Sequence, residues 1–354
     1  MPVKKLSFVT LLCVACLLIL PNVAAKTVNG LYSGELKVES QSLTARRQAA
    51  VKLFKLVLIK VSGRSDVVEQ AAISGQLKDA MRYITTFNYV VRQGNTFLSA
   101  SFNESLIDNL LKQAGISIWG NQRPTAMIWL AIQDASEQRI IVADDVNAPF
   151  SQVVTQAIKA RGVPMLLPLW DLEDQFSVSG SEIWGLFHDS VGGANLRYGS
   201  DFMVLGKVKY IGLNYQLNWA IYKKTGLYGY EEIVATGLDE FADSDRALKG
   251  LVDQTSDFFA SQYSVDTSDE GGYEFVVNNV NSIGVYAKIL DYLTGLKSVE
   301  SVQLVKSKGS IFTFQAKIIG STNSLSEVLK LEQKLVKTYD DEQGKTQYNW
   351  QAKR

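Results

Sequence analysis

The sequence predicts an α/β protein of the α+β type, in which a signal peptide is followed by three small modules with mixed sheets. Stretches that alternate apolar and polar residues, as strands do, are interspersed with stretches of helical period. The composition turns polar and rich in glycine near Gly120 and Gly271, which indicates module boundaries. A chain of 354 residues has room for two or three domains, each with its own core.

Residues 1–25 have the pattern of a secretory signal peptide. Lys4 and Lys5 precede an apolar stretch of about 15 residues, which ends in small residues at Ala24 and Ala25. A membrane-spanning helix needs about 20 apolar residues, so cleavage after Ala25 is favoured over a membrane anchor. Lipidation at Cys16 is a second alternative, but the residues after Cys16 are too apolar for a lipoprotein's mature start. We therefore expect a Sec-exported periplasmic protein that is not integral to the membrane, with peripheral association left open.

The mature chain lacks thiols and has nearly balanced charge. Both cysteines, Cys13 and Cys16, lie in the leader, so no disulfide, thiolate metal site or cysteine nucleophile can form. Of the 36 basic side chains, Lys4 and Lys5 also lie there, which leaves 34 against 36 acidic ones and a formal charge of −2. This balance creates no overall field that would attract nucleic acid, so we expect no nucleic-acid partner.

The first module, residues 26–120, begins with an alternating strand and continues with a long amphipathic helix at 40–63. Arg46 and Arg47 lie on the polar side of this helix, which is either an ordinary solvated face or a surface for acidic lipid or polymer. Two strands joined near Gly94 and a helix at 103–115 complete a small α+β sandwich.

The second module, residues 121–263, has the order β, α, β, α, followed by three strands and a closing helix. This order indicates a mixed sheet with helices packed on it. The expected elements are strands at 126–132 and 139–143, a helix at 148–162, a buried strand at 163–169, a short helix near 180–187, a meander at 198–226 and a helix at 243–263.

A polar linker at 264–272 leads to the third module, residues 273–354. We expect a strand at 273–280, a helix at 281–295, a hairpin at 298–320 and a second helix at 323–339. If the segment at 346–352 adds a last strand, the order β-α-β-β-α-β is that of a ferredoxin-like unit.

No group of residues points clearly to catalysis, a cofactor or a metal. His188 is the single histidine, which excludes a two-histidine metal site. Beside Asp189 it is either an oriented base or a helix-end residue with a local hydrogen bond. The loop at 170–175 contains three acids, Asp171, Glu173 and Asp174, which could act as paired carboxylates in a glycosidase or simply cap a helix. The glycines at 192–199 lack the order of a dinucleotide-binding loop.

Two tyrosines near a predicted hairpin tip are the candidate partner contacts. Tyr228 and Tyr230 flank a glycine and follow two basic residues, Lys223 and Lys224. Aromatic residues in loops are enriched at protein interfaces. Two arrangements remain open, since the rings either project toward a partner or fold back onto the sheet.

Five segments between Gly30 and Ala260 together resemble proteobacterial envelope proteins grouped as domain-of-unknown-function family 2066. The second module is similar in its "YGSDFMVLG" strand and its hairpin ending in Thr225-Gly226 to a fold group that includes the amino-terminal domain of the Tol translocation protein B and a curli secretion protein. The chain departs from these relatives because it has no propeller repeats. The five segments are ARRQAAVKLFKLVLIKVSGRSDV, LLKQAGISIWGNQRPTAMIWLAI, GVPMLLPLWDLEDQ, SEIWGLF and RYGSDFMVLGKV.

The resemblance implies a role in the cell envelope that involves no catalysis. We therefore expect a non-enzymatic periplasmic binding or assembly-scaffold protein that contacts another envelope protein. The alternative is a carboxylate-dependent hydrolase of cell-wall glycan that uses Asp171, Glu173 or Asp174.

Overall fold

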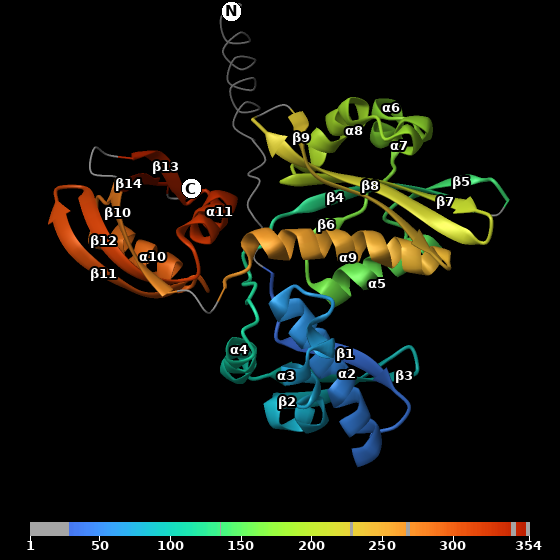
Figure 1. Cartoon of the computed structure of the whole chain (residues 1–354), viewed down its shortest axis with the longest axis horizontal. Helices are drawn as coiled ribbons and strands as arrows, with labels where there is room; N and C mark the ends of the chain where they lie inside the picture. The colour runs from blue at the N-terminus through green and yellow to red at the C-terminus, as the bar shows by residue number, and fades with distance from the viewer. Residues whose placement is uncertain (1–27, 135, 227–228, 267–269, 341–344, 352–354) are drawn as a thin grey trace, which may run out of the picture.

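The computed structural model describes residues 28–134, 136–226, 229–266, 270–340 and 345–351, and it confirms the mixed α/β fold. Three sheets follow one another along the chain, each with its own helices and core (Figure 1). The signal peptide expected at 1–25 lies outside this described part. Within it, no helix has both the length and the apolar character that crossing a bilayer requires.

The first sheet is antiparallel and has the order β1-β3-β2. The long helix α2 packs on it, as predicted, because its apolar residues recur at helical spacing and end up fully buried, Leu53, Phe54 and Val57 among them. The Ser42 hydroxyl caps its start, and Gly63 ends it in the left-handed region at φ 72°. The elements are β1 Ser33–Val38, α2 Leu43–Ser62, η1 Val67–Glu69, α3 Ala71–Ser74, η2 Leu77–Tyr83, β2 Ile84–Arg92, β3 Asn95–Phe102 and α4 Glu104–Gln113.

The second sheet has the order β5-β4-β7-β8-β9, with β6 beside β4, and it is covered on both faces. Figure 1 shows α5 and α9 on one face and α6, α7 and α8 on the other. The strands are β4 Ala126–Gln133, β5 Arg139–Val142, β6 Met165–Leu166, β7 Phe202–Ile211, β8 Asn214–Thr225 and β9 Gly229–Phe241. The helices are α5 Pro149–Arg161, α6 Leu172–Ser177, α7 Gly180–Gly185, α8 His188–Asn195, η3 Leu196–Tyr198 and α9 Ser244–Tyr263.

The third sheet has the order β11-β12-β10-β14-β13, and its last strand, β14, runs parallel to β10, whereas the last strand of a ferredoxin-like sheet runs antiparallel to the first. The strand β13, which the sequence did not predict, lies at the edge. This strand replaces part of the helix expected at 323–339. That helix ends at Glu332 because Gln333 adopts a left-handed conformation at φ 51°, and the residues after it pair with β14. The elements are β10 Glu270–Asn278, α10 Ile283–Thr294, β11 Val299–Lys308, β12 Ile311–Ile319, α11 Thr322–Glu332, β13 Leu335–Asp340 and β14 Thr346–Trp350.

The segment expected as a linker, 264–272, is tied to its surroundings at both ends. Val265 forms an antiparallel bridge with Ile118, at the end of the first module. At the other end, β10 already begins at Glu270 and pairs there with Ile319. The main chain therefore brings the end of the first module and the start of the third close together.

Candidate functional site

The three acids at 170–175 gather around one arginine. Asp171 accepts the backbone N–H of Asp174 at 3.1 Å and so caps α6. Its two carboxylate oxygens also accept a bidentate pair of hydrogen bonds from the Nη1 and Nη2 atoms of Arg197, at 2.7 and 2.9 Å. Asp174 reaches the same guanidinium at 3.0 Å and Glu173 at 3.6 Å. Hydrogen bonding to Arg197 holds the pKa of the Asp171 carboxyl well below its usual range.

Asp174 is fully buried, and its second oxygen has two further donors. The Tyr198 hydroxyl donates to it at 2.6 Å and the backbone N–H of Trp170 at 2.8 Å. The Tyr198 oxygen in turn accepts the N–H of Leu169 at 2.9 Å. Burial, together with the bond to Asp174, raises the pKa of Tyr198 to about 12. This network fixes the start of α6 against η3.

The geometry of these acids does not suit glycoside hydrolysis. A glycosidase needs two carboxyls facing each other across an open cleft, one of them protonated. Here Arg197 lies between the carboxylates, and it keeps Asp171 ionised, so Asp171 is no proton donor. Asp171 and Asp174 instead hold the start of α6 in place.

The same segment turns its apolar side chains to solvent. Leu172 and Phe176 lie four residues apart, hence on one side of α6, and are 70% and 87% exposed. Leu169, just before the helix, is 54% exposed. Of the three acids only Asp174 is buried, whereas the other two are exposed, so α6 keeps one carboxylate inside and both of its large apolar side chains outside, unlike an ordinary surface helix. We call Leu169, Leu172 and Phe176 the α6 ridge.

Acidic groups flank the α6 ridge. Glu173 lies on α6 itself, and its side chain is 67% exposed. The backbone N–H of Asp144 donates to the carbonyl of Pro168, which places the exposed Asp144 and Asp145 next to Leu169. Arg197, the cation of this segment, is already engaged by carboxylates. The ridge is therefore an apolar strip with an acidic border.

The expected partner contacts at the β8–β9 hairpin do not form an exposed site. Tyr230 is only 2% exposed, and its hydroxyl donates to the carbonyl of Ser200 at 2.7 Å, so of the two arrangements left open its ring folds back onto the sheet and does not project. Its ring folds back because the side chain lies on the face of β9 that α8 covers. Tyr228 lies outside the described residues. Lys223 and Lys224 are partly buried, and Lys223 lies 3.8 Å from Glu327 on α11.

His188 begins α8 and contacts both its neighbour Asp189 and a ring of β8. Its ring stacks on Tyr222 at 5.1 Å, and its Nε2 lies 3.1 Å from an Asp189 oxygen. In the part of the chain that the structure describes, no cluster of histidine, cysteine and acidic residues could hold a metal ion.

A feature that sequence reasoning missed lies where the first two modules meet. Arg123 is fully buried, and its acceptors are main-chain carbonyls. They include Lys60 at 2.5 Å, Arg161 at 3.2 Å and Gly162 at 3.0 Å, at the ends of α2 and α5, where helix carbonyls lack partners. One guanidinium thus caps the C-terminal ends of two helices that belong to different modules. The negative ends of both helix dipoles help to offset its charge, and burial lowers the pKa of Arg123 to about 9.

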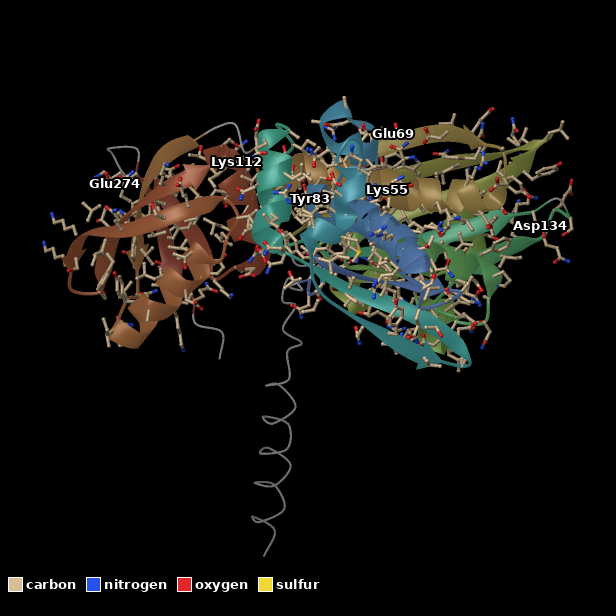
Figure 2. All side chains as sticks on the ribbon, turned by 90° about the horizontal axis from the view of Figure 1, so that it is seen from below. Lys55, Glu69, Tyr83, Lys112, Asp134 and Glu274 are labelled. Carbon is tan, nitrogen blue, oxygen red and sulfur yellow. The ribbon has the colours of Figure 1, made fainter. Side chains whose placement is uncertain are left out.

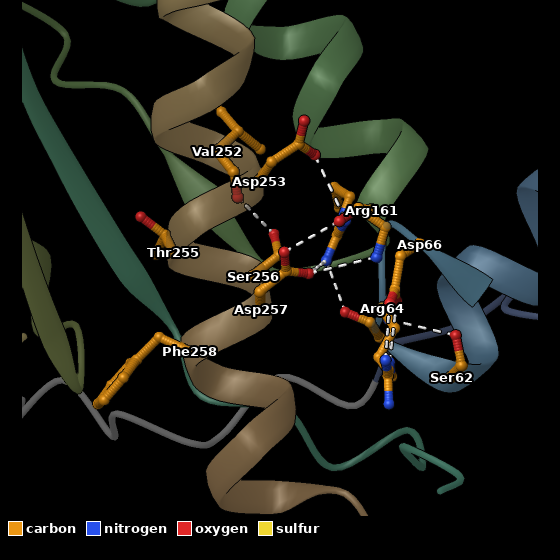
Figure 3. A network of polar contacts seen from close by, with 12 residues as sticks. Ser62, Arg64, Asp66, Arg161, Val252, Asp253, Thr255, Ser256, Asp257 and Phe258 are labelled. Atoms are coloured by element: carbon orange, nitrogen blue, oxygen red, sulfur yellow. Dashed lines mark hydrogen bonds and ion pairs between the residues drawn. The ribbon is translucent and has the colours of Figure 1, made fainter. Parts of the chain in front are cut away.

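A second arginine extends this joint (Figure 3). Arg161, at the end of α5, donates to the carbonyl of Gly63 at 2.5 Å and contacts two acids on α9, Asp253 and Asp257. Asp257 also accepts the hydroxyl of Ser65 at 3.0 Å. Because these contacts join residues far apart in sequence, no local pattern could have indicated them.

A family model matches the first module, and it is not the family that the sequence led us to expect. A family model described as "Domain of unknown function (DUF8605)" matches residues 25–120, so the expected membership of family 2066 is wrong. No curated protein matches the chain.

Similarity to solved structures is too weak to carry an argument. An uncharacterized protein is 9% identical, with 39% of this chain and 88% of that one covered and a TM-score of 0.15. Formyltetrahydrofolate deformylase from Burkholderia mallei ATCC 23344 is 12% identical, with 57% and 89% covered and a TM-score of 0.13. Neither is described as a Tol or curli protein, so the expected likeness to that group is not supported.

Proposed function

We propose that this chain is a non-enzymatic binding protein of the bacterial envelope, and that it contacts another protein through the α6 ridge (Leu169, Leu172 and Phe176). The observation that carries the proposal is that Leu169, Leu172 and Phe176 are exposed while Asp174 of the same segment is buried. A network of buried and capping acids holds three large apolar side chains in water. Exposed apolar surface of this kind gains free energy when a partner covers it.

The acidic border describes the partner. Glu173, Asp144 and Asp145 flank the apolar strip and would repel anionic lipid headgroups. The fitting surface is therefore a protein face with an apolar centre and a rim of lysine or arginine. The periplasmic location of this contact rests on the signal-peptide pattern of residues 1–25.

In-cell photocrosslinking tests the proposal. A photoreactive residue at Phe176 should capture one predominant protein, whereas the same residue at Leu213 should not. Leu213 is a matched control because it is equally exposed, at 87%, but lies in the turn between β7 and β8. Binding of the purified captured protein should then weaken by about 30-fold or more in Phe176→Ser, as for an aromatic hot spot.

Two results would count against the proposal. The same protein captured from Leu213 would indicate nonspecific contact, and unchanged binding to Phe176→Ser would exclude the ridge. Sequencing of the mature end tests the location separately, since a mature protein that still begins at Met1 would rule out export by leader cleavage.

A further inference from the structure

A pocket of about 520 Å³ opens at the joint of the first two modules. Its size lies within the range of small-molecule sites, roughly 300–1,000 Å³. Residues of both modules line it, and none of them belongs to the α6 ridge. Its apolar wall includes Leu31, Ile158, Met165 and Leu166, and the last of these is 52% exposed.

The charged groups of this pocket are both lysines. Lys60, from the last turn of α2, makes one hydrogen bond, to the carbonyl of Ser33 at 3.1 Å. An ammonium group has three N–H donors, so two find no acceptor among the described residues. Lys159, on α5, is exposed at the same pocket and has no carboxylate partner within the described ranges.

Two other cations with little exposed side chain have carboxylate partners, whereas the buried Arg123 has main-chain carbonyls. Arg161 contacts two acids on α9, and Lys297 contacts Glu104 at 2.5 Å and Asp108 at 2.6 Å. Near Lys60 there is a second cation instead of an acid, because the guanidinium of Arg123 donates to the main-chain carbonyl of Lys60. Burial, and after it the charge of Arg123, lowers the pKa of Lys60, as expected for a cation without a nearby anion. The helix dipoles offset only part of this charge.

We propose that this pocket binds a small amphipathic carboxylate, with its hydrocarbon chain against the apolar wall and its carboxylate on the free N–H donors of Lys60. Lys159 adds a second positive charge at the same pocket. A largely apolar wall with few polar groups suits a hydrocarbon chain better than a sugar or a nucleotide. A charge-assisted hydrogen bond in such a place strengthens binding by about tenfold to a hundredfold.

Calorimetry with decanoate as the probe tests this assignment on the purified protein. Decanoate should bind saturably, and decanol, which has the same chain without the charge, should bind at least about tenfold more weakly. Acetate, which has the charge without the chain, should show no saturable binding. Lys60→Met should remove the preference for decanoate over decanol. Lys55→Met is the matched control, since it removes an exposed lysine from the same helix (Figure 2), and it should bind decanoate as the wild type does.

A second variant tests decanoate binding at the same pocket without replacing Lys60. Leu166→Glu changes a half-exposed side chain and places a carboxylate in the pocket wall, so decanoate binding should fall at least about tenfold by charge repulsion. Absence of saturable decanoate binding would overturn the proposal. So would decanoate binding that is equal in the wild type and Leu166→Glu, or a preference for decanoate that survives in folded Lys60→Met.

Discussion

Replacing Arg123 with methionine keeps much of the side chain's apolar bulk but removes its donors from five main-chain carbonyls. Two of these bonds, to Trp119 at 2.9 Å and to Arg161 at 3.2 Å, are fully buried. Each buried carbonyl left without a donor costs about 1–3 kcal/mol. Relief of the buried charge offsets part of this loss. We therefore expect the free energy of unfolding to fall by about 2–4 kcal/mol.

Urea unfolding measures this loss in the transition that includes the first two modules. Arg64→Met is the control, because Arg64 lies in the same joint but its side chain is 49% exposed and pairs with Asp66 at the surface. It should cost less than about 1 kcal/mol. Hydrogen exchange should rise in the last turns of both α2 and α5 in Arg123→Met. If that variant loses less than about 1 kcal/mol, or if exchange rises in only one helix, the guanidinium does not cap both helices as we describe.

Three further predictions concern α6 and the third module. Asp174→Ala should lower the free energy of unfolding by on the order of 3 kcal/mol, because it removes a buried carboxylate with three donors. Phe176→Ser should change the free energy of unfolding by less than about 0.5 kcal/mol. Thermal melts of both variants measure these losses, and equal losses in the two variants would contradict the prediction. The raised pKa of Tyr198 means that its neutral phenol stabilises the fold below the ordinary pKa of 10.0 and that this contribution disappears as the pH rises to about 12. The stability difference between wild type and Tyr198→Phe should therefore shrink over that interval, and a constant difference would exclude the effect. Lys297→Met should loosen the third module from α4, because it removes a cation bonded to two acids there, and small-angle scattering should show a larger radius of gyration. Lys288→Met, an exposed lysine of α10, should leave the radius unchanged, and equal radii in all three proteins would show that Lys297 does not hold the module.

Local periodicity predicted much of the fold. The helical spacing of Leu53, Phe54 and Val57 placed α2 and its buried face correctly, and in the third module the first strand, the first helix and the hairpin lie close to where the sequence predicted them. The same reasoning failed where apolar residues continue past a helix end. Beyond Gln333, the next apolar residues belong to a strand, and only the left-handed conformation of Gln333 marks the change.

The candidate site was less predictable because its contacts are not local. Three acids in one short loop resemble a catalytic set until Arg197, 26 residues after Asp171, is placed among them. Tyr230 resembled an exposed contact because it follows a glycine near a turn, yet the strand that contains it carries its ring under α8. The exposure of Phe176 also depends on these distant partners, although its spacing from Leu172 was visible in the sequence.

The place of Arg123 bears on how the chain can be divided. The family match covers residues 25–120 and stops three positions before the side chain that completes α2. A fragment cut at that boundary would contain every residue of the helix and still leave the carbonyl of Lys60 without its donor. The segment that the family model matches is therefore not the same as the segment that satisfies the hydrogen bonds of α2. Whoever transplants this module into another protein must carry Arg123 along, or supply a new donor from whatever segment is joined to it.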